Sequence, residues 1–518
     1  MPKIQRALVS VTDKTGLADF ARCLANLRIE IISTGGTARL LREAGLAVRE
    51  VSDVTGFPEM LDGRVKTIHP KIAGGILAVR GNPAHQSALA QHGIPPIDMV
   101  VVNLYAFEQV AARAEVAVSE LIEQIDIGGP TLIRAAAKNW QDVAVLTSPD
   151  QYSQIAEELR ASGGELCPGT CWRLAVEAFR RTADYDRAIS TRLARLEYCD
   201  GGFVDRQQTL PDVLDLRAPR ARSLRYGENP HQAAALYACG RSGIAGAEQL
   251  QGKELSYNNL VDLDAAFQLV SEFERPAAAI IKHTNPCGCA EQESLAEAYR
   301  KAFECDPVSA FGGVLGFNRP LDAETAHEVA KTFIEAIAAT DYTAEARAIL
   351  AAKKNLRLVK VDRPSPGDLV IKSISGGYLV QTPDLESFDR ARARVVTERA
   401  PSEQQWQALE FGWKVVKHVK SNAIVYARPG QMVGVGAGQM SRVDSVKIGA
   451  LRAVLPLEGS VLASDAFFPF PDGVEEAARH GVTAVIQPGG SIRDDEVIAA
   501  ASRLGLAMVF TGVRHFRH

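Results

Sequence analysis

A lysine and a histidine, Lys282 and His283, directly follow an apolar run at 277–281. The run predicts a buried strand, so both side chains would lie at a strand end, where open α/β sheets bind ligands. Histidine titrates near neutrality, and an adjacent ammonium group can hold a developing negative charge or lend a proton. The pair is a candidate proton-transfer site, although two such residues alone are more often a polar surface turn.

The cysteines that follow, in Pro286-Cys287-Gly288-Cys289, raise the alternative of a zinc nucleobase deaminase. That chemistry needs His-x-Glu upstream and Pro-Cys-x-x-Cys. Here the residue two after His283 is Asn285, and the second cysteine comes one residue early. A glycine series at 434–438 suggests a dinucleotide loop, but its spacing is wrong and no well-placed acid follows. Both patterns are weak signals.

Four apolar runs in the first third, at 7–11, 29–32, 98–102 and 143–146, read as strands. Segments with helical periodicity separate them, including the one at 17–26. This alternation predicts a parallel sheet with helices on its faces. The chain is therefore expected to be of the α/β class.

Polar residues cluster at the predicted strand–helix junctions of this region. The turn Ser33-Thr34-Gly35-Gly36-Thr37 could present free backbone N–H groups and hydroxyls to a phosphate, and its glycines allow close approach. Taken alone, such a turn is more often only a helix start. Lys66, Tyr105, Asp126 and Lys138 also lie at or near junctions, so we expect them to converge at one end of the sheet.

Length and composition limit the classes of protein to which this chain could belong. A chain of 518 residues corresponds to two to four domains, and 46% hydrophobic with 23% charged residues is ordinary for a globular protein. The net charge of −4 and the lack of a basic arm argue against a nucleic-acid partner. We expect no signal peptide, no membrane span and a cytoplasmic location. The eight scattered cysteines fit reduced, cytosolic usage.

Domain limits are suggested by changes in pattern along the chain. Residues 151–198 read as helical, with an apolar stripe that includes Tyr185 and that we interpret as packing. Residues 200–222 are irregular and predict a linker after a domain at 1–199. Two rounds of strand and helix follow in 223–518, which predicts two similar subdomains, approximately 223–385 and 386–518.

Nine motifs together resemble one enzyme family, the bifunctional purine-biosynthesis proteins. Those that resemble its inosine monophosphate (IMP) cyclohydrolase domain are 62–70, 103–105, 125–129 and 135–139. Those that resemble its aminoimidazole carboxamide ribonucleotide (AICAR) transformylase domain are 223–232, 282–288, 421–424, 436–439 and 464–470. One departure is Ala106, where the family usually has proline; this should change turn stiffness more than chemistry.

The resemblance implies a fold and a function. The first domain would be methylglyoxal-synthase-like, and the second would contain two cytidine-deaminase-like subdomains without zinc. The enzyme would transfer the formyl group of 10-formyltetrahydrofolate to the 5-amino group of AICAR, then close the ring of formyl-AICAR, with loss of water, to IMP. The resemblance further implies a homodimer that shares its transformylase site, no catalytic metal, and room for a structural potassium ion.

For formyl transfer, the hypothesis assigns catalysis to three residues. His283 would take the amine proton, Lys282 would stabilise the tetrahedral oxygen or protonate the folate nitrogen, and Asn422 would orient the formyl oxygen and His283. By family match, the substrate contacts would be Arg225, Tyr226, Lys253, Phe311, Gly312, Glu335 (on a helical stretch), Asp465, Phe467 and Arg514.

For ring closure, Lys66 and Tyr105 would stabilise the oxygen, while Asp126 and Lys138 would move the amide proton. Holding the two reacting groups in contact can itself supply much of the acceleration. The phosphate and ribose contacts would be Ser10, Lys14, Ser33, Thr34, Gly35, Thr37, Arg64, Thr67, Gly128 and Gly129. A module that only senses a nucleotide is the second alternative, but it would need no such proton-transfer set.

Overall fold

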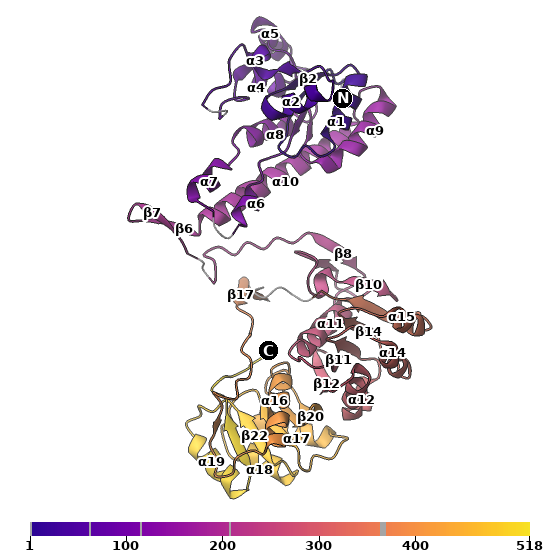
Figure 1. The fold of residues 1–518 in the computed structure, drawn as a ribbon, viewed down its shortest axis with the longest axis vertical. Helices are drawn as coiled ribbons and strands as arrows, with labels where there is room; N and C mark the ends of the chain where they lie inside the picture. Colours follow the sequence, from indigo (N-terminus) through magenta and orange to yellow (C-terminus); the bar gives the residue numbers. More distant parts are fainter. Residues whose placement is uncertain (1–2, 62–63, 114–115, 207–208, 363–368) are drawn as a thin grey trace. The chain divides into compact units, whose positions relative to one another are not determined.

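In the computed structural model the chain divides into two compact units, Met1–Thr209 and Leu210–His518 (Figure 1). The structure describes residues 3–61, 64–113, 116–206, 209–362 and 369–518, so the motif residues Asp62 and Gly63 lie outside the described part. Near the predicted end of the first domain, β6 (Leu196–Cys199) and β7 (Gly202–Asp205) form a hairpin, which puts Tyr198 in a strand where a helix was expected.

The first unit contains a sheet that, among the described residues, has five strands in the order β3-β2-β1-β4-β5, all parallel. The strands are β1 (Arg6–Ser10), β2 (Glu30–Ser33), β3 (Arg49–Glu50), β4 (Met99–Val102) and β5 (Ala144–Leu146). Val100 and Val101 illustrate why these runs are continuously apolar, since both are fully buried on opposite faces of β4. The predicted parallel sheet is confirmed.

Helices cover this sheet and connect its strands (Figure 1). They are α1 (Leu17–Asn26), α2 (Gly35–Glu43), α3 (Val51–Thr55), α4 (Pro70–Leu77), α5 (Pro83–Gln91), α6 (Phe107–Ala111), α7 (Val118–Glu123), α8 (Gly128–Lys138), α9 (Tyr152–Ser162) and α10 (Pro168–Leu193). The short 3₁₀ turn η1 (Pro149–Gln151) precedes α9. Parallel strands place their carboxyl ends at one edge, so Ser10 and Ser33 end neighbouring strands at the same edge of the sheet.

The second unit is built on a mixed sheet of twelve strands within the described residues, in the order β10-β15-β14-β13-β11-β12-β20-β19-β21-β22-β23-β18. These strands are β10 (Glu248–Gln251), β11 (Ala277–Lys282), β12 (Asn285–Glu291), β13 (Val314–Phe317), β14 (Ala336–Ala339), β15 (Arg357–Lys360), β18 (Arg394–Val395), β19 (Ile424–Arg428), β20 (Gln431–Gly436), β21 (Val461–Ser464), β22 (Ala484–Gln487) and β23 (Ala507–Phe510). Two small hairpins lie apart, formed by β8 (Arg220–Leu224) with β9 (Ala234–Tyr237) and β16 (Val370–Ile374) with β17 (Gly377–Gln381).

The two halves of this sheet have the same pattern of strand pairing. In the first half β11 pairs antiparallel with β12 and β13, and β13, β14 and β15 run parallel. In the second half β19 pairs antiparallel with β20 and β21, and β21, β22 and β23 run parallel. The halves join where β12 pairs antiparallel with β20. The two halves of the sheet therefore share one strand topology.

The helices of the second unit follow the same repeat. They are α11 (Tyr257–Val270), α12 (Leu295–Cys305), α13 (Pro307–Ala310), α14 (Ala323–Ala330), α15 (Ala344–Leu350), α16 (Glu403–Val416), α17 (Arg442–Arg452), α18 (Asp472–Arg479) and α19 (Asp494–Arg503), with a 3₁₀ turn η2 (Ile244–Gly246). α11 and α16 precede the equivalent strands β11 and β19, and both begin with a capping box, Ser256 with Asn259 and Ser402 with Gln405. Within the described residues, no helix is both long and apolar enough to cross a membrane.

Glu335 was expected on a helical stretch, and the structure corrects this. α14 ends at Ala330, and Glu335 directly precedes β14 with its backbone N–H donating to the carbonyl oxygen of Gly313 at 3.0 Å. β14 lies between two parallel neighbours and its four residues are all buried. A short strand of this kind is an unbroken apolar run, and periodicity does not separate it from a buried helix.

The glycine series at 434–438 serves packing between β20 and α17. A Cβ added to Gly436 would overlap the carbonyl oxygen of Ser445 on that helix. We therefore expect Gly436→Ala to destabilise the second unit by about 1–3 kcal/mol through overpacking. Urea unfolding measures this. Gly377→Ala is the control, because a Cβ there meets nothing within 4 Å, and equal stability of the two variants would contradict the packing role.

Candidate active sites

The His283 side chain lies on a tight turn that reverses the chain from β11 into β12. Its two central residues, His283 and Thr284, have positive φ angles of 51° and 65°, which match the turns that join antiparallel strands and are uncommon for residues other than glycine. The carboxylate of Asp262 on α11 accepts the backbone N–H of Thr284 at 2.7 Å. The predicted strand is thus confirmed, but it ends in an antiparallel hairpin held by a helix.

Lys282 is fixed beside the loop that precedes β13. Its Nζ donates to the carbonyl oxygens of Phe311 at 3.0 Å and Gly312 at 3.2 Å. The Phe311 ring is 61% exposed and lies 5.2 Å from that of Phe333. The structure therefore brings together the predicted residues Lys282, His283, Phe311 and Gly312, with an exposed aromatic face beside the ammonium group.

Asn285 connects this turn to the second half of the sheet, and the sequence analysis assigned it no role. Its Oδ1 accepts the backbone N–H of Lys420 at 3.0 Å, and its Nδ2 donates to the carbonyl oxygen of His283 at 3.2 Å. Lys420 is two residues before Asn422. Asn285 thus links the segments that carry two predicted catalytic residues, and its place in the Lys-His-Thr-Asn motif was the available signal.

The Asn422 carboxamide is held at both ends. Its Oδ1 accepts from Arg442 Nη2 at 2.7 Å, and its Nδ2 donates to the carbonyl oxygens of Gln439 at 2.8 Å and Met440 at 3.2 Å. Any bond to a formyl oxygen would have to replace one of these. Arg442 is a further residue that the sequence analysis did not identify.

Asp465 was predicted to contact folate or nucleotide, and the structure gives its carboxylate a different task. The residue is fully buried, pairs with Arg442, and accepts the backbone N–H of Ala423 at 3.1 Å and the Ser421 hydroxyl. These bonds hold the segment around Asn422. The Asp465 carboxylate is therefore engaged by protein groups and shielded from solvent.

Three of the remaining predicted contacts of this unit, Arg225, Arg514 and Glu335, contact neighbouring side chains. The Arg225 guanidinium stacks 4.7 Å from the Tyr226 ring centre, and Arg514 lies 4.3 Å from that of Phe516. The Glu335 carboxylate pairs with Arg357 at 3.0 Å. Lys253 and Phe467 complete the predicted set; Lys253 is exposed, and Phe467 is half-buried.

In the first unit, the Asp126 carboxylate lies at the start of α8 and accepts the backbone N–H of Gly129 at 2.8 Å. Burial raises the pKa of Asp126, while the backbone N–H groups of Gly129, Tyr105 and Gly128 oppose that rise. A Cβ at Gly129 would overlap this carboxylate. Asp126, Tyr105, Gly128 and Gly129 are therefore brought together, and the second glycine makes room for Asp126.

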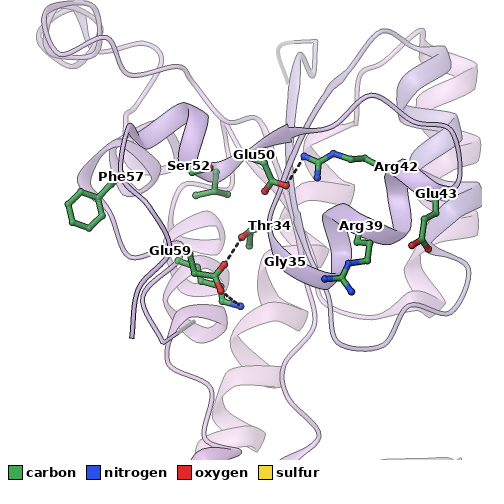
Figure 2. A pocket seen from close by; sticks show the side chains of 11 residues that line it. Thr34, Gly35, Arg39, Arg42, Glu43, Glu50, Ser52, Phe57 and Glu59 are labelled. Atoms are coloured by element: carbon green, nitrogen blue, oxygen red, sulfur yellow. Dashed lines mark hydrogen bonds and ion pairs between the residues drawn. The ribbon is translucent and has the colours of Figure 1, made fainter. Parts of the chain in front are cut away.

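Lys66 lies above the start of α2 in a pocket of about 420 Å³. Its Nζ pairs with Glu59 at 3.1 Å and would lie 3.5 Å from a Cβ on Gly35. The Thr34 hydroxyl donates to the same Glu59 at 3.5 Å, as Figure 2 shows. The pocket is lined by Thr34, Gly35, Arg39, Arg42, Glu43, Glu50, Val51, Ser52, Phe57, Glu59 and Lys66. Sequence reasoning missed Arg39, Arg42 and Glu59, which belong to no motif.

Two of the predicted phosphate contacts have their hydroxyl groups engaged inside the protein. Ser33 Oγ donates to the carbonyl oxygen of Val9 at 2.7 Å, and Thr37 Oγ1 both donates to Val11 O at 3.0 Å and accepts Val11 N–H at 3.1 Å. Both residues are buried. In this region a phosphate contact would fall to backbone N–H groups at the start of α2, which remain unpaired within a helix.

Thr67 and Gly128 connect this pocket to Asp126, whereas Lys138 does not join the group. Thr67 Oγ1 would lie 3.1 Å from a Cβ on Gly128. Lys138 is the last residue of α8, so its Cα lies about 15 Å along the helix from that of Gly128. The expected convergence of four residues at one end of the sheet is therefore wrong for Lys138.

The other predicted contacts of the first unit lie on loops at the carboxyl edge or beyond it. Ser10 ends β1, and the Lys14 ammonium group donates to the carbonyl oxygen of Thr12 at 3.4 Å. Asn103 holds that loop by accepting the backbone N–H groups of Thr12 and Asp13. Arg64 pairs with Glu123.

Comparisons with known proteins match both parts of the chain to known families. A model described as "MGS-like domain" matches residues 16–131, and one described as "AICARFT/IMPCHase bienzyme" matches residues 136–452. A "Bifunctional purine biosynthesis protein PurH" from Rhodospirillum rubrum is 54% identical over 531 residues, covering 99% of each chain. This chain belongs to the AICARFT/IMPCHase bienzyme family. The PurH protein of Parvibaculum lavamentivorans is 53% identical and covers 100% of this chain and 97% of its own.

Membership of the AICARFT/IMPCHase family confirms the resemblance seen in the sequence. The chain is a bifunctional enzyme of purine biosynthesis, an AICAR formyltransferase and IMP cyclohydrolase. The fold class is also confirmed, with an MGS-like first domain. A solved chain described as "Crystal structure of ForH" is 34% identical, covers 36% of this chain and 96% of its own, and has a TM-score of 0.34.

Family membership makes both alternatives wrong, the zinc nucleobase deaminase and the regulatory module. The cysteines that suggested the deaminase are core residues of β12, and the Cys287 thiol donates to the carbonyl oxygen of Ile280 at 3.5 Å. Burial raises the pKa of Cys287 to about 12. Within the described ranges, no group of three or more His, Cys, Asp or Glu side chains could hold a metal ion.

Proposed function

We propose that each unit carries one of the two reactions, formyl transfer in the second and ring closure in the first. The observation that carries this proposal is that the two proton-transfer sets belong to different units of the chain. Lys282 and His283 lie on the β11–β12 hairpin, and Asp126 and Tyr105 meet at the start of α8 in the other unit. Each set contains a candidate base, His283 or Asp126, and a group that could stabilise the reacting oxygen, Lys282 or Tyr105.

In formyl transfer, the amine of AICAR is a poor nucleophile because it is conjugated with the ring and the carboxamide. His283 takes the proton from this nitrogen as it attacks the formyl carbon of 10-formyltetrahydrofolate. Lys282 stabilises the tetrahedral oxygen or protonates the folate nitrogen as it leaves. Its two carbonyl partners hold the ammonium group beside Phe311, whose exposed ring offers a stacking surface for a heterocycle.

Asn422 orients the formyl oxygen and His283. The remaining substrate contacts are Arg225, Tyr226, Lys253, Phe311, Gly312, Glu335, Phe467 and Arg514. Arginine suits a phosphate or carboxylate through its planar fork, and tyrosine stacks on heterocycles.

In ring closure, the carboxamide nitrogen attacks the formyl carbon, and the formyl oxygen becomes a hydroxyl group that leaves as water. Asp126 takes the proton from that nitrogen, and its burial brings its pKa toward the working range of a base. Lys66 and Tyr105 stabilise the oxygen. Glu59 holds the Lys66 ammonium group over the pocket that receives the nucleotide. Lys138 is assigned to proton movement by the resemblance alone.

The wider assignments follow the family. The enzyme works as a cytoplasmic homodimer whose transformylase site is shared between subunits, and the two halves of 223–518 are cytidine-deaminase-like subdomains after a linker at 200–222. Its substrates are AICAR, formyl-AICAR and the folate. A structural potassium ion is part of this assignment by the resemblance alone, and no proposed catalytic step uses a metal.

An absorbance assay with AICAR and 10-formyltetrahydrofolate tests the proposal. The purified protein should release tetrahydrofolate and IMP in equal amounts, because the second reaction consumes the product of the first. Formyl-AICAR supplied directly should give IMP without folate. A protein that binds these nucleotides and forms neither product would contradict the assignment.

A further inference from the structure

Tyr185 of α10 reaches from the helix layer to the segment that carries Asp126. Its hydroxyl accepts the backbone N–H of Asp126 at 2.8 Å and donates to the carbonyl oxygen of Gln124 at 3.0 Å. One side chain therefore fixes both ends of the Gln124–Asp126 segment. The tyrosine is fully buried, so these two bonds are not exchanged with water.

The ring of the same residue contacts the segment that carries Tyr105. It packs edge-on against Phe107, with ring centres 6.3 Å apart and planes at 73°. Phe107 is fully buried and is the first residue of α6, two positions after Tyr105. Tyr185 thus touches both segments that meet at the cyclohydrolase site, the one before α6 and the one before α8.

The helix that supplies this side chain is a rigid support. α10 spans 26 residues, and Figure 1 shows it beside α8, which begins at the Asp126 carboxylate. A site held by packed helices is placed more accurately than one held by loops alone, and a shift of about 1 Å can reduce a rate by about 100-fold.

We propose that Tyr185 is a positioning residue for ring closure: its hydroxyl fixes the Gln124–Asp126 segment so that the Asp126 carboxylate faces Tyr105. This rests on the proposed role of Asp126. Tyr185 reaches the reaction only through the backbone of that segment, and its effect is on geometry. The sequence predicts Tyr185 as a packing residue of an apolar stripe, and the two hydrogen bonds of its hydroxyl add a second role.

The state of the hydroxyl agrees with such a role. Burial raises the pKa of Tyr185 to about 12, and the nearby Asp126 charge adds to this rise. The phenol therefore stays protonated across the working pH range and can always donate to Gln124. It holds its proton and does not exchange it with substrate.

Tyr185→Phe tests the proposal, because it removes the hydroxyl and keeps the ring against Phe107. We expect kcat for ring closure of supplied formyl-AICAR to fall at least about tenfold, with KM and the Kd for IMP within about twofold of wild type. Formyl transfer should be unchanged. A purely structural role would lower the apparent kcat only in proportion to the folded fraction, so correcting the rate for that fraction would restore the wild-type value.

Tyr342→Phe is the matched control in the other unit. Tyr342 is also buried, and its hydroxyl likewise bridges two backbone groups, donating to Ile337 O at 2.9 Å and accepting Val359 N–H at 3.2 Å. This variant should lower stability to a similar degree and leave ring closure at the wild-type rate. A similar loss of ring closure in both variants would overturn the proposal.

Asp126→Asn separates failure of this inference from failure of the proposed function. If Asp126→Asn closes the ring at the wild-type rate, the assigned role of Asp126 is wrong and the positioning role falls with it. If Asp126→Asn is inactive while Tyr185→Phe keeps wild-type kcat, only the positioning role is wrong. Should Tyr185→Phe be insoluble, hydrogen exchange of the wild type decides: an unprotected Asp126 amide would overturn the proposal, and a protected one supports it.

Discussion

Replacing His283 with alanine is expected to reduce formyl transfer by about 10²–10⁴-fold, the usual contribution of a general base. The amine of AICAR then has no group on the β11–β12 turn to take its proton. Ring closure of supplied formyl-AICAR should continue at the wild-type rate, because Asp126 and Lys66 belong to the other unit. The measurement is the initial rate of tetrahydrofolate release, followed by absorbance.

The control for this variant is His327→Ala, which removes an exposed histidine from α14 in the same unit. It should transfer the formyl group normally. Near wild-type formyl transfer by His283→Ala would refute its role as the base. A simultaneous loss of ring closure would argue against independent sites.

Asp126→Asn is expected to reduce ring closure by about 10²–10⁴-fold and to leave formyl transfer intact. The amide is close in shape to the carboxylate and can still accept the Gly129 N–H, so the start of α8 should be retained. It lacks the charge needed to take a proton from the carboxamide. The measurement is IMP formation from supplied formyl-AICAR, with the exposed Asp19→Asn of α1 as the matched control.

Lys138→Ala provides a second comparison for this site. Lys138 lies at the far end of α8 from Asp126, so we expect its loss to reduce ring closure less than that of Asp126. A larger loss in Lys138→Ala than in Asp126→Asn would show that the lysine, and not the carboxylate, dominates proton movement.

The pH dependence of ring closure follows from the environment of Asp126. Burial raises the pKa of Asp126 above the ordinary value of an aspartate side chain. The carboxylate form is therefore lost at a higher pH than for an exposed aspartate, and the acidic limb of the rate should lie at a correspondingly higher pH. Asp126→Asn should lack this limb in its residual activity.

Local patterns of apolar residues in the sequence predicted much of the fold. The apolar runs at 7–11 and 277–281 became β1 and β11, and the helix expected at 17–26 became α1 with the same ends. These elements are buried or amphipathic along their whole length, so their own residues specify them. The helix expected at Glu335 was wrong because α14 ends at Ala330 and the short buried strand β14 begins directly after Glu335.

The predicted catalytic residues were easier to find than the residues that hold them. Lys282, His283 and Asp126 have side chains whose chemistry is visible in a motif. Asn285 and Tyr185 act by bonding to backbone groups, 135 and 59 positions away respectively. Such partners are created by tertiary packing, and the local sequence does not show which backbone groups these side chains reach.

Some of the predicted ligand contacts have polar atoms that are engaged inside the protein. Ser33, Thr37 and Asp465 have residue types suited to binding ligands, yet the structure buries them and satisfies their polar atoms internally. The position of Lys138 was predicted wrongly because α8 begins beside Asp126 and ends at Lys138, so the two residues lie at opposite ends of the helix. Residue type and spacing reveal neither the internal hydrogen bonds of a side chain nor the end of the sheet at which it lies.

The most direct test of the account is a crystal structure of the enzyme with AICAR bound. We expect the 5-amino nitrogen of the nucleotide to lie within about 2.6–3.2 Å of an imidazole nitrogen of His283, or to reach it through one water. The Lys282 ammonium group should face the space beside that nitrogen where the formyl carbon must enter. An amine bound far from the imidazole would contradict the account.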